Sequence, residues 1–489
     1  MFSTTATAER RRLSLAVLLA AMLVAGGVAR AASSRPSPQS LGGLVEKAPA
    51  PRPIDYARLT AEATELLARE IRINTTNPPG NELAAAKLLK EKFLADGIPA
   101  TVWEPAPGRG IVAARLHGTG HHSAAVVLLS HLDVAPANPK EWQVPPFSGA
   151  VRDGAVWGRG AIDDKGPGVI DLMAMLAIKR AGRLLDRDVI FLATGDEEAG
   201  GRDGAGWMVE HEADVFGDAA YLLNEGGSIM VRPNGRRYYG VSITEKTPLW
   251  IRLTAPGLEG SGATPPEETA VTRLVAALAR ISAYRAQIRI INPVRDYFKA
   301  IAELDGGPPA LRDLGRSLRD DPVFTKQFVA TPRNNALVRD TFTATMLEGS
   351  PQINVIPARA SAAIDGRLMP GEDAAAVVAN LRRVIADDAI KCDVILNFPS
   401  ATSPRNTRLM TALEKVAARD HDVVVPMLIA DFTDSHYFRD KGLIAYGFIP
   451  IELTPAEERG VHGVNERMPI KELSGGIRRM VALLEAAAR

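Results

Sequence analysis

The chain has 489 residues, of which 46% are hydrophobic and 24% charged, with 58 Lys and Arg against 57 Asp and Glu. This balance excludes the basic excess that nucleic-acid binding requires, and the length predicts two or three domains with a large buried core. The single cysteine, Cys392, excludes an intramolecular disulfide, so any bound metal must be held by histidine and carboxylate side chains.

The first element is an apolar run near the N-terminus. Arg10, Arg11 and Arg12 precede LSLAVLLAAMLVAGGVA, and an Ala-Arg-Ala site ends at Ala31. These features are typical of a secretory signal peptide, so residues 1–31 are predicted to be removed and the mature protein to be exported to the periplasm or the extracellular space. An uncleaved anchor is the alternative, because the run is close to the minimum length of a membrane span. Residues 32–53, rich in Ser and Pro, are predicted to form a linker, and no stable membrane insertion is expected after cleavage.

Helical and strand patterns alternate after the linker. Apolar residues at helical spacing predict helices over 56–73 and 81–96, after Pro167, and over 205–212. Short apolar runs predict buried strands at 124–130, 188–194 and 219–224. This alternation is typical of an α/β sheet with helices on both faces, in which functional sites lie where strands end.

Two polar motifs follow predicted strands closely. In Ser130-His131-Leu132-Asp133, the period of two places His131 and Asp133 on one side, where a carboxylate can fix the tautomer of a metal-binding imidazole. The alternative is a hydrogen-bonded structural histidine. In TGDEEAGG (194–201), three adjacent carboxylates repel one another, which is unfavourable in a partly buried loop unless a cation or solvent compensates them. The alternative is a solvated acidic turn.

Three further motifs complete a set of metal-ligand types. GRGAIDDKG (158–166) carries Asp163 and Asp164, which could instead cap the helix that follows. NEGG places Glu225 directly after a strand, and HGVNER places His462 near the C-terminus. Together the motifs supply two histidines, an aspartate and two or three glutamates. Two divalent ions about 3.5 to 4 Å apart, bridged by one carboxylate, need this inventory.

SHLDV, GRGAIDDKG, DEEAGG, NEGG, INVIP followed by DGR, TDS and VHGVNE occur in this order over nearly the whole mature chain. In this the sequence resembles the dinuclear zinc metallohydrolases that include aminoacylase, carboxypeptidase G, carboxypeptidase S and succinyl-diaminopimelate desuccinylase. The resemblance implies an α/β fold: a zinc-peptidase-like catalytic domain (54–244 and 404–489) with a mixed central sheet flanked by helices, and a smaller α+β lid inserted at 245–403. Extra helix-like sequence at about 292–340 makes this lid similar to those of carboxypeptidase S and the secreted N-acyl amino acid hydrolases.

The resemblance also implies roles for individual residues. The two zinc ions are held by His131 and Glu225, by Glu198 and His462, and by Asp163, which bridges them. Cobalt or manganese would also suit these mixed nitrogen and oxygen ligands. Asp133 orients His131. Glu197 is the general base that takes a proton from the bridging water and returns it to the leaving amine.

The lid residues Asn354 and Arg367 match positions that approach the substrate's carboxylate or the reacting carbonyl in the family. A structural ion pair is the alternative for Arg367. The family usually has a lid histidine that stabilises the oxyanion, but none of the eight histidines falls in 245–403, and Ser261 stands at about the expected place. The loss of such a donor costs about 2.7 to 4 kcal/mol of barrier. Either Ser261, Asn354 or Arg367 substitutes for it, or the enzyme is slower or has an unusual substrate.

The segment ADFTDSH is a second departure. Relatives commonly have glycines before TDS and often Arg after it, in a pocket for the substrate carboxylate. Thr433, Asp434, Ser435 and His436 are therefore predicted to border the substrate, and the bulkier segment puts the usual preference for a free α-carboxylate in doubt. The pair His121-His122 is expected to be a loop feature rather than a ligand site.

The predicted function is that of a secreted metal-dependent hydrolase that cleaves an amide bond in a small peptide or an N-acyl amino acid, of the carboxypeptidase or aminoacylase type. A zinc aminopeptidase or dipeptidase on the same scaffold is one alternative. A catalytically impaired binding protein is another. A homodimer that forms through the lid is possible. Because the lid has no histidine, however, the sequence gives no reason to expect that a partner subunit contributes a residue to the active site.

Overall fold

The computed structural model describes residues 51–120 and 124–488. The predicted signal peptide, almost all of the linker and the pair His121-His122 lie outside these ranges. Among the described helices, none is both long and apolar enough to cross a bilayer.

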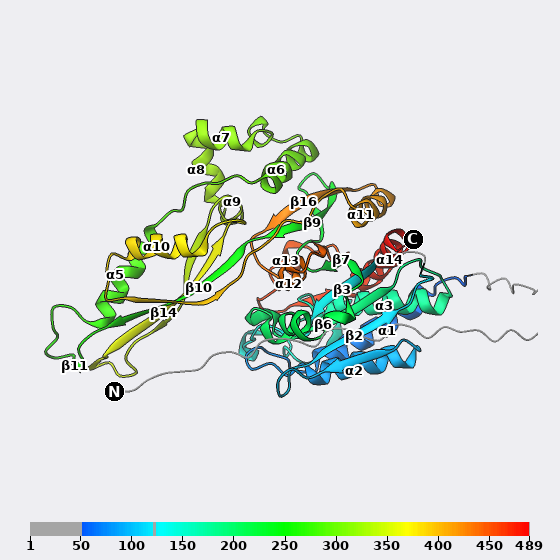
Figure 1. The fold of residues 1–489 in the computed structure, drawn as a ribbon, viewed down its shortest axis with the longest axis horizontal. Helices are drawn as coiled ribbons and strands as arrows, with labels where there is room; N and C mark the ends of the chain where they lie inside the picture. The colour runs from blue at the N-terminus through cyan, green and yellow to red at the C-terminus, as the bar shows by residue number, and fades with distance from the viewer. Residues whose placement is uncertain (1–50, 121–123, 489) are drawn as a thin grey trace, which may run out of the picture. The chain divides into compact units, whose positions relative to one another are not determined.

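A nine-stranded mixed sheet forms the larger part of the fold (Figure 1). Its strands are β1 (Ala100–Trp103), β2 (Ile111–Leu116), β3 (Ala125–His131), β6 (Val189–Thr194), β7 (Ala219–Asn224), β8 (Ile229–Val231), β9 (Arg237–Glu245), β16 (Val423–Ile429) and β17 (Ile444–Gly447). The order is β1-β2-β6-β3-β7-β17-β9-β16, with β8 paired to β9. Strands β6, β3, β7 and β17 are parallel neighbours, whereas β1, β2 and β6 pair antiparallel. The predicted mixed sheet is confirmed.

Helices cover both faces of this sheet, which explains the continuous apolar runs. In β3, Val126 and Leu128 enter one core while Val127 and Leu129 enter the other. The helices on the first face are α1 (Tyr56–Ile71), α2 (Leu83–Ala95), α3 (Lys165–Ala181), α11 (Arg408–Arg419) and α14 (Ile470–Ala487). The second face is covered by α4 (Trp207–His211) and α12 (Ser435–Asp440). Helix α4 is shorter than the helix predicted over 205–212, because a π-turn at Arg202–Gly206 precedes it.

A second, antiparallel sheet has the order β12-β14-β10-β15. Its strands are β10 (Thr247–Pro256), β12 (Thr341–Glu348), β14 (Arg359–Leu368) and β15 (Lys391–Asn397), and α5 (Ala270–Ala283) and α10 (Ala374–Ile385) pack on one face. Burial alternates along β10 and β14, as in a sheet with one covered face. All four strands fall inside the predicted insertion, 245–403, while the domain boundaries stay a prediction.

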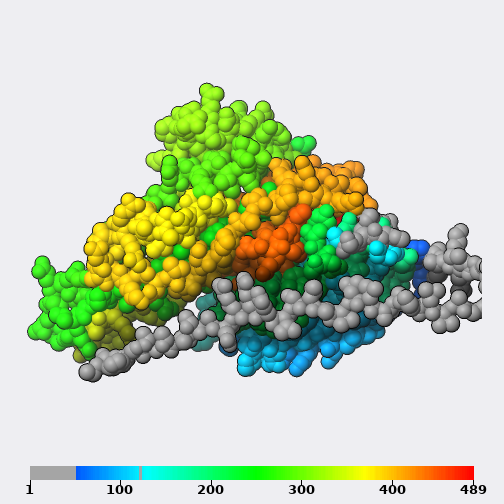
Figure 2. All heavy atoms as spheres, viewed as in Figure 1, coloured from blue at the N-terminus to red at the C-terminus, as the bar shows by residue number. Residues whose placement is uncertain are grey.

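The extra segment predicted at about 292–340 is helical. It forms α6 (Asn292–Asp305), α7 (Leu314–Asp320), α8 (Pro322–Ala330) and α9 (Pro332–Val338). Apolar residues of these helices share a core with Tyr238 of β9 and Val425 and Met427 of β16. The light-green atoms of this segment form a protrusion at the top of Figure 2.

Short elements complete the fold. They are β4 (Ala150–Arg152), β5 (Ala155–Trp157) and β18 (Arg467–Pro469), which form a three-stranded sheet, the pair β11 (Gly260–Ser261) and β13 (Val355–Ile356), and the helix α13 (Pro455–Glu458). The β18–β5 pairing joins the C-terminal segment after His462 to the segment that precedes Asp163.

Candidate functional site

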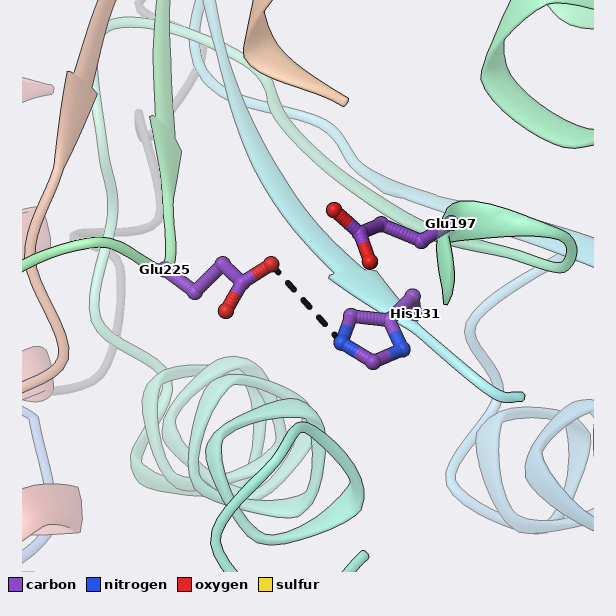
Figure 3. Close-up of side chains that lie close together, drawn as sticks. All are labelled: His131, Glu197 and Glu225. Carbon is purple, nitrogen blue, oxygen red and sulfur yellow. Dashed lines mark ion pairs between the residues drawn. The ribbon is translucent and has the colours of Figure 1, made fainter. Parts of the chain in front are cut away.

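Three polar side chains meet at the carboxyl ends of adjacent parallel strands. His131 is the last residue of β3, Glu197 opens a 3-10 turn after β6, and Glu225 directly follows β7. Figure 3 shows Glu225 to the left of the His131 ring, with the ion pair dashed, and Glu197 above the ring. His131 Nε2 lies 3.7 Å from Glu225 Oε1, and one ligand atom from each of the three residues lies within 4.8 Å of the others.

Asp163 joins this group to a second one. Its Oδ1 lies 2.9 Å from His131 Nε2 and its Oδ2 lies 3.1 Å from His462 Nε2. His462 Nε2 also lies 3.2 Å from Glu198 Oε2, so that Asp163, Glu198 and His462 form a second group of potential ligands. One carboxylate that faces both histidines has the position that a bridging ligand needs.

Asp164 stands at the N-cap of α3 without a capping hydrogen bond. Its Oδ2 instead accepts a hydrogen bond from the backbone N–H of His131. Helix capping therefore does not explain the two adjacent aspartates.

Asp133 holds both the histidine and the acidic turn. His131 Nδ1 lies 2.9 Å from the backbone oxygen of Asp133 and 3.6 Å from its carboxylate, which leaves Nε2 to face Asp163. The two carboxylate oxygens of Asp133 accept hydrogen bonds from the backbone N–H groups of Glu197 and Glu198, each at 3.1 Å. Asp133 thus orients His131 mainly through its backbone and fixes the turn with its side chain.

The acidic turn is buried, so a solvated surface turn is excluded: Asp196 and Glu197 are 6% and 8% exposed. Burial, reinforced by the Glu225 carboxylate, raises the pKa of Glu197 well above its ordinary value. Burial and Asp163 do the same to the pKa of Glu225. Hydrogen bonds to the carboxylates of Asp163 and then Glu198 raise the pKa of His462 to about 11.

Buried acids that oppose one another's ionisation indicate a site for cations. Glu198 Oε1 is buried without a hydrogen-bond partner, which leaves an oxygen lone pair available to an ion. The imidazole and carboxylate donors suit zinc and similar divalent ions. The residues present therefore fit two ions, one at each group.

A buried polar network behind the site was not predicted. Asn77 donates to Asp133 Oδ2 at 2.9 Å and to Asp196 Oδ1 at 3.2 Å. Arg109 pairs with Asp196 at 2.8 Å and with Glu82 at 2.6 Å. The Asn-Pro-Pro-Gly sequence at 77–80 indicates a turn, but no local signal places this turn against Asp133.

Glu466 was also missed, although it lies in the motif that supplied His462. It is fully buried, and its carboxylate accepts hydrogen bonds from Arg159 and from the backbone N–H groups of Gly160, Ile162 and Asp163. Glu466 thus fixes the loop that carries Asp163.

A cavity of about 480 Å³ opens beside the ligand groups. Its lining includes Asp163, Glu198 and His462 and four apolar side chains, Trp250, Ile429, Phe432 and Val461. Of the predicted substrate residues, Arg367 and Thr433 reach this cavity.

The other predicted substrate residues lie elsewhere. Asp434, Ser435 and His436 are buried: Asp434 accepts a hydrogen bond from Thr194, Ser435 bonds Asn224, and His436 stacks on Phe398. Ser261 and Asn354 are exposed and do not line the cavity. The prediction that Ser261 or Asn354 takes the place of the lid histidine is therefore not favoured by this arrangement.

The comparisons with known proteins agree with this geometry. A sequence model of Peptidase family M20/M25/M40 matches residues 127–486. The N-fatty-acyl-amino acid synthase/hydrolase PM20D1 of Xenopus tropicalis is 29% identical over 364 residues, 72% of this chain and 70% of its own. Aminoacylase-1A of Rattus norvegicus is 27% identical over 410 residues, 82% of this chain and 90% of its own. The structure of the di-peptidase Dug1p of Saccharomyces cerevisiae matches with a TM-score of 0.70 at 15% identity, over 88% of this chain and 97% of that one.

The family match covers most of the chain and includes both ligand groups and the acidic turn. The family also includes a dinuclear metal-binding peptidase, in agreement with two ligand groups that share Asp163. The chain therefore belongs to Peptidase family M20/M25/M40, whose members are metal-dependent hydrolases of amide bonds.

Proposed function

We propose that this protein is an exported dinuclear zinc hydrolase that cleaves the amide bond of N-acyl amino acids, with Glu197 as the general base. The observation that carries the proposal is the position of Asp163 between His131 and His462, with Glu197 beside the same centre. Export rests on the signal-like sequence of residues 1–31.

The ligand assignment follows from the distances. His131, Glu225 and Asp163 would hold one ion, and Asp163, Glu198 and His462 the other. Two such ions would supply Lewis acidity, which would polarise an amide carbonyl and lower the pKa of a water molecule. Glu197 would take the proton of the attacking water as the water oxygen bonds to the carbonyl carbon, and would deliver it to the nitrogen as the C–N bond breaks. Its backbone N–H is fixed by Asp133, and its side chain lies beside His131 and Glu225.

The cavity supports an apolar acyl group as part of the substrate. Trp250, Ile429, Phe432 and Val461 contribute apolar surface to the cavity that the ligand groups also line, so an acyl chain can leave water there while its amide reaches the centre. Among the relatives, the PM20D1 protein is an N-fatty-acyl-amino acid hydrolase by name, which agrees with this choice.

The test compares the wild type with Glu197→Gln and Glu198→Gln. We expect two metal ions per chain in the wild type, measured by atomic spectroscopy, and hydrolysis of N-acyl amino acids that is lost on chelation and restored by zinc. Glu197→Gln should keep both ions but lose about 10²- to 10⁴-fold in kcat, whereas Glu198→Gln should lose one ion.

Two results would contradict the proposal. Retained turnover in Glu197→Gln would remove its role as the base, and loss of one ion in that variant would make Glu197 a ligand. Export is tested separately by expression of the full chain: the mature protein should be recovered from the periplasm or medium with Ala32 at its N-terminus.

A further inference from the structure

Arg367 reaches the cavity with its charge already paired. Its Nε lies 2.7 Å from Asp365 Oδ1, and its Nη1 lies 2.5 Å from Asp431 Oδ1. The guanidinium also lies over the ring of Phe432, 4.7 Å from the centroid. Arg367, Asp431 and Phe432 all line the cavity that holds Asp163 and His462.

The two acidic partners differ in how firmly they are held. Asp365 Oδ1 also accepts a hydrogen bond from Trp250 Nε1 at 2.9 Å, so it is fixed from both sides. The Asp431 side chain is 70% exposed, whereas that of Arg367 is 19% exposed. Asp431 can therefore leave the guanidinium for water, while Arg367 stays in place between Asp365 and Phe432.

The charges of Arg367, Asp365 and Asp431 decide which substrate group this part of the cavity accepts. Arg367 with Asp365 and Asp431 carries a net charge of −1. A substrate carboxylate therefore meets a guanidinium whose Nη1 is already bound by another carboxylate. Such a substrate must displace Asp431 and then remain near its charge. A neutral amide or a cationic group meets no such competition and is favoured by the exposed Asp431 oxygen.

We propose that Asp431 is a specificity-determining residue that occupies the carboxylate-binding edge of Arg367, so that the cavity prefers substrates with a neutral or cationic group at this position over those with a free α-carboxylate. The proposal rests on the proposed function and modifies its substrate class: the acyl group and the cleaved amide are retained, but an amide or a basic group takes the place of the free α-carboxylate.

The test measures a ratio in matched variants. Asp431→Asn removes the charge with little change in shape, and Asp431→Glu keeps it. Glu458→Gln removes a negative charge from another exposed residue that lines the same cavity. The substrates are N-acetyl-leucine and N-acetyl-leucinamide, and kcat/KM for cleavage of the acetyl amide is measured for each.

In Asp431→Asn we expect the acid-to-amide ratio of kcat/KM to rise at least about tenfold, through a lower KM for the acid. Asp431→Glu should keep the wild-type ratio, and Glu458→Gln should move it less than threefold. An unchanged ratio in Asp431→Asn, or an equal change in Glu458→Gln, would overturn the proposal.

A binding experiment separates this inference from the proposed function. Calorimetric titration of zinc-loaded Glu197→Gln protein, with and without Asp431→Asn, gives the affinities for the same two ligands without turnover. A rise in relative affinity for the acid supports the inference even if no variant hydrolyses either compound, an outcome that would contradict the proposed function alone. Equal affinities in the two backgrounds, or no binding of either ligand, would overturn the inference.

Discussion

Replacement of Glu466 by glutamine tests how the loop that carries Asp163 is held. One carboxylate oxygen of Glu466 accepts the backbone N–H groups of Ile162, at 2.7 Å, and Asp163, at 3.1 Å. The other accepts the N–H of Gly160, at 3.0 Å, and Nη1 of Arg159, at 2.6 Å. Glutamine keeps the shape of the side chain but has a single acceptor oxygen, so one of these two pairs of donors loses its partner.

The expected loss follows from these contacts. If the amide nitrogen faces Arg159, a buried guanidinium loses its charged partner, which costs about 3–5 kcal/mol, and the N–H of Gly160 becomes unsatisfied. If it faces the other pair, Arg159 keeps a hydrogen bond to a neutral oxygen in place of its ion pair, and a buried and a part-buried N–H group lose their partner at about 1–3 kcal/mol each. Either way we expect a loss of about 4 kcal/mol in the free energy of unfolding, a large part of the about 5–15 kcal/mol that stabilises a typical domain.

The assay is denaturant unfolding with zinc in excess and after chelation, together with zinc content. The matched control is Glu472→Gln: this buried glutamate accepts one backbone N–H, from Glu452, which the glutamine oxygen can still accept. The charge it loses lies 3.7 Å from Arg479 and 3.8 Å from Lys471, so the substitution should cost about 1 kcal/mol or less. Because the Glu466 loop carries Asp163, Glu466→Gln should also bind zinc more weakly. A loss below about 1 kcal/mol for Glu466→Gln would refute the reasoning.

Two further predictions concern His436 and Asn77. Burial, and then Arg439, lower the pKa of His436 from 6.5 to about 3. The unfolded chain therefore binds the extra proton below pH 6.5, so the free energy of unfolding falls as the pH drops from 6.5 towards 3, by up to about 1.4 kcal/mol per unit from this group. Denaturation at pH 7.5 and pH 5 should show a smaller fall in His436→Phe, which can still stack on Phe398, and equal falls would contradict this. Asn77→Ala removes the amide that joins Asp133 to Asp196 and should lower kcat/KM or zinc affinity about 10- to 100-fold. Zinc affinity is measured by chelator competition. An effect below twofold on both quantities would exclude a positioning role for Asn77.

The parallel strands β3, β6 and β7 of the large sheet could be predicted because their signals are local. The run of β3 is apolar throughout since alternate residues enter two different cores, and this pattern is visible in sequence. His131 and Glu225 could be picked out as candidate ligands for the same reason, because they stand directly at the ends of parallel strands. The bounds of the short helix α4 were predicted less accurately, because nothing in the sequence marks where the preceding π-turn ends.

The residues behind the site could not be predicted, because their partners are far away along the chain. Asn77 and Asp133 are 56 positions apart, and Arg159 and Glu466 are 307 apart. A buried acceptor for backbone N–H groups has no pattern of its own in sequence. Ser261 illustrates the same limit: its place in the motif order suggested a role in catalysis, but its position in space depends on where β11 lies.

The two sides of the cavity are therefore expected to respond differently to substitution. On the metal side, Asp133 and Glu466 satisfy several buried donors each, so a change there lowers both stability and metal affinity. On the substrate side, Asp431 is exposed and makes one ion pair with Arg367 across the cavity wall, so a change there alters the charge that a ligand meets while leaving the fold intact. Specificity in this chain can thus change through the segment before Thr433 without disturbing the groups that hold the ions.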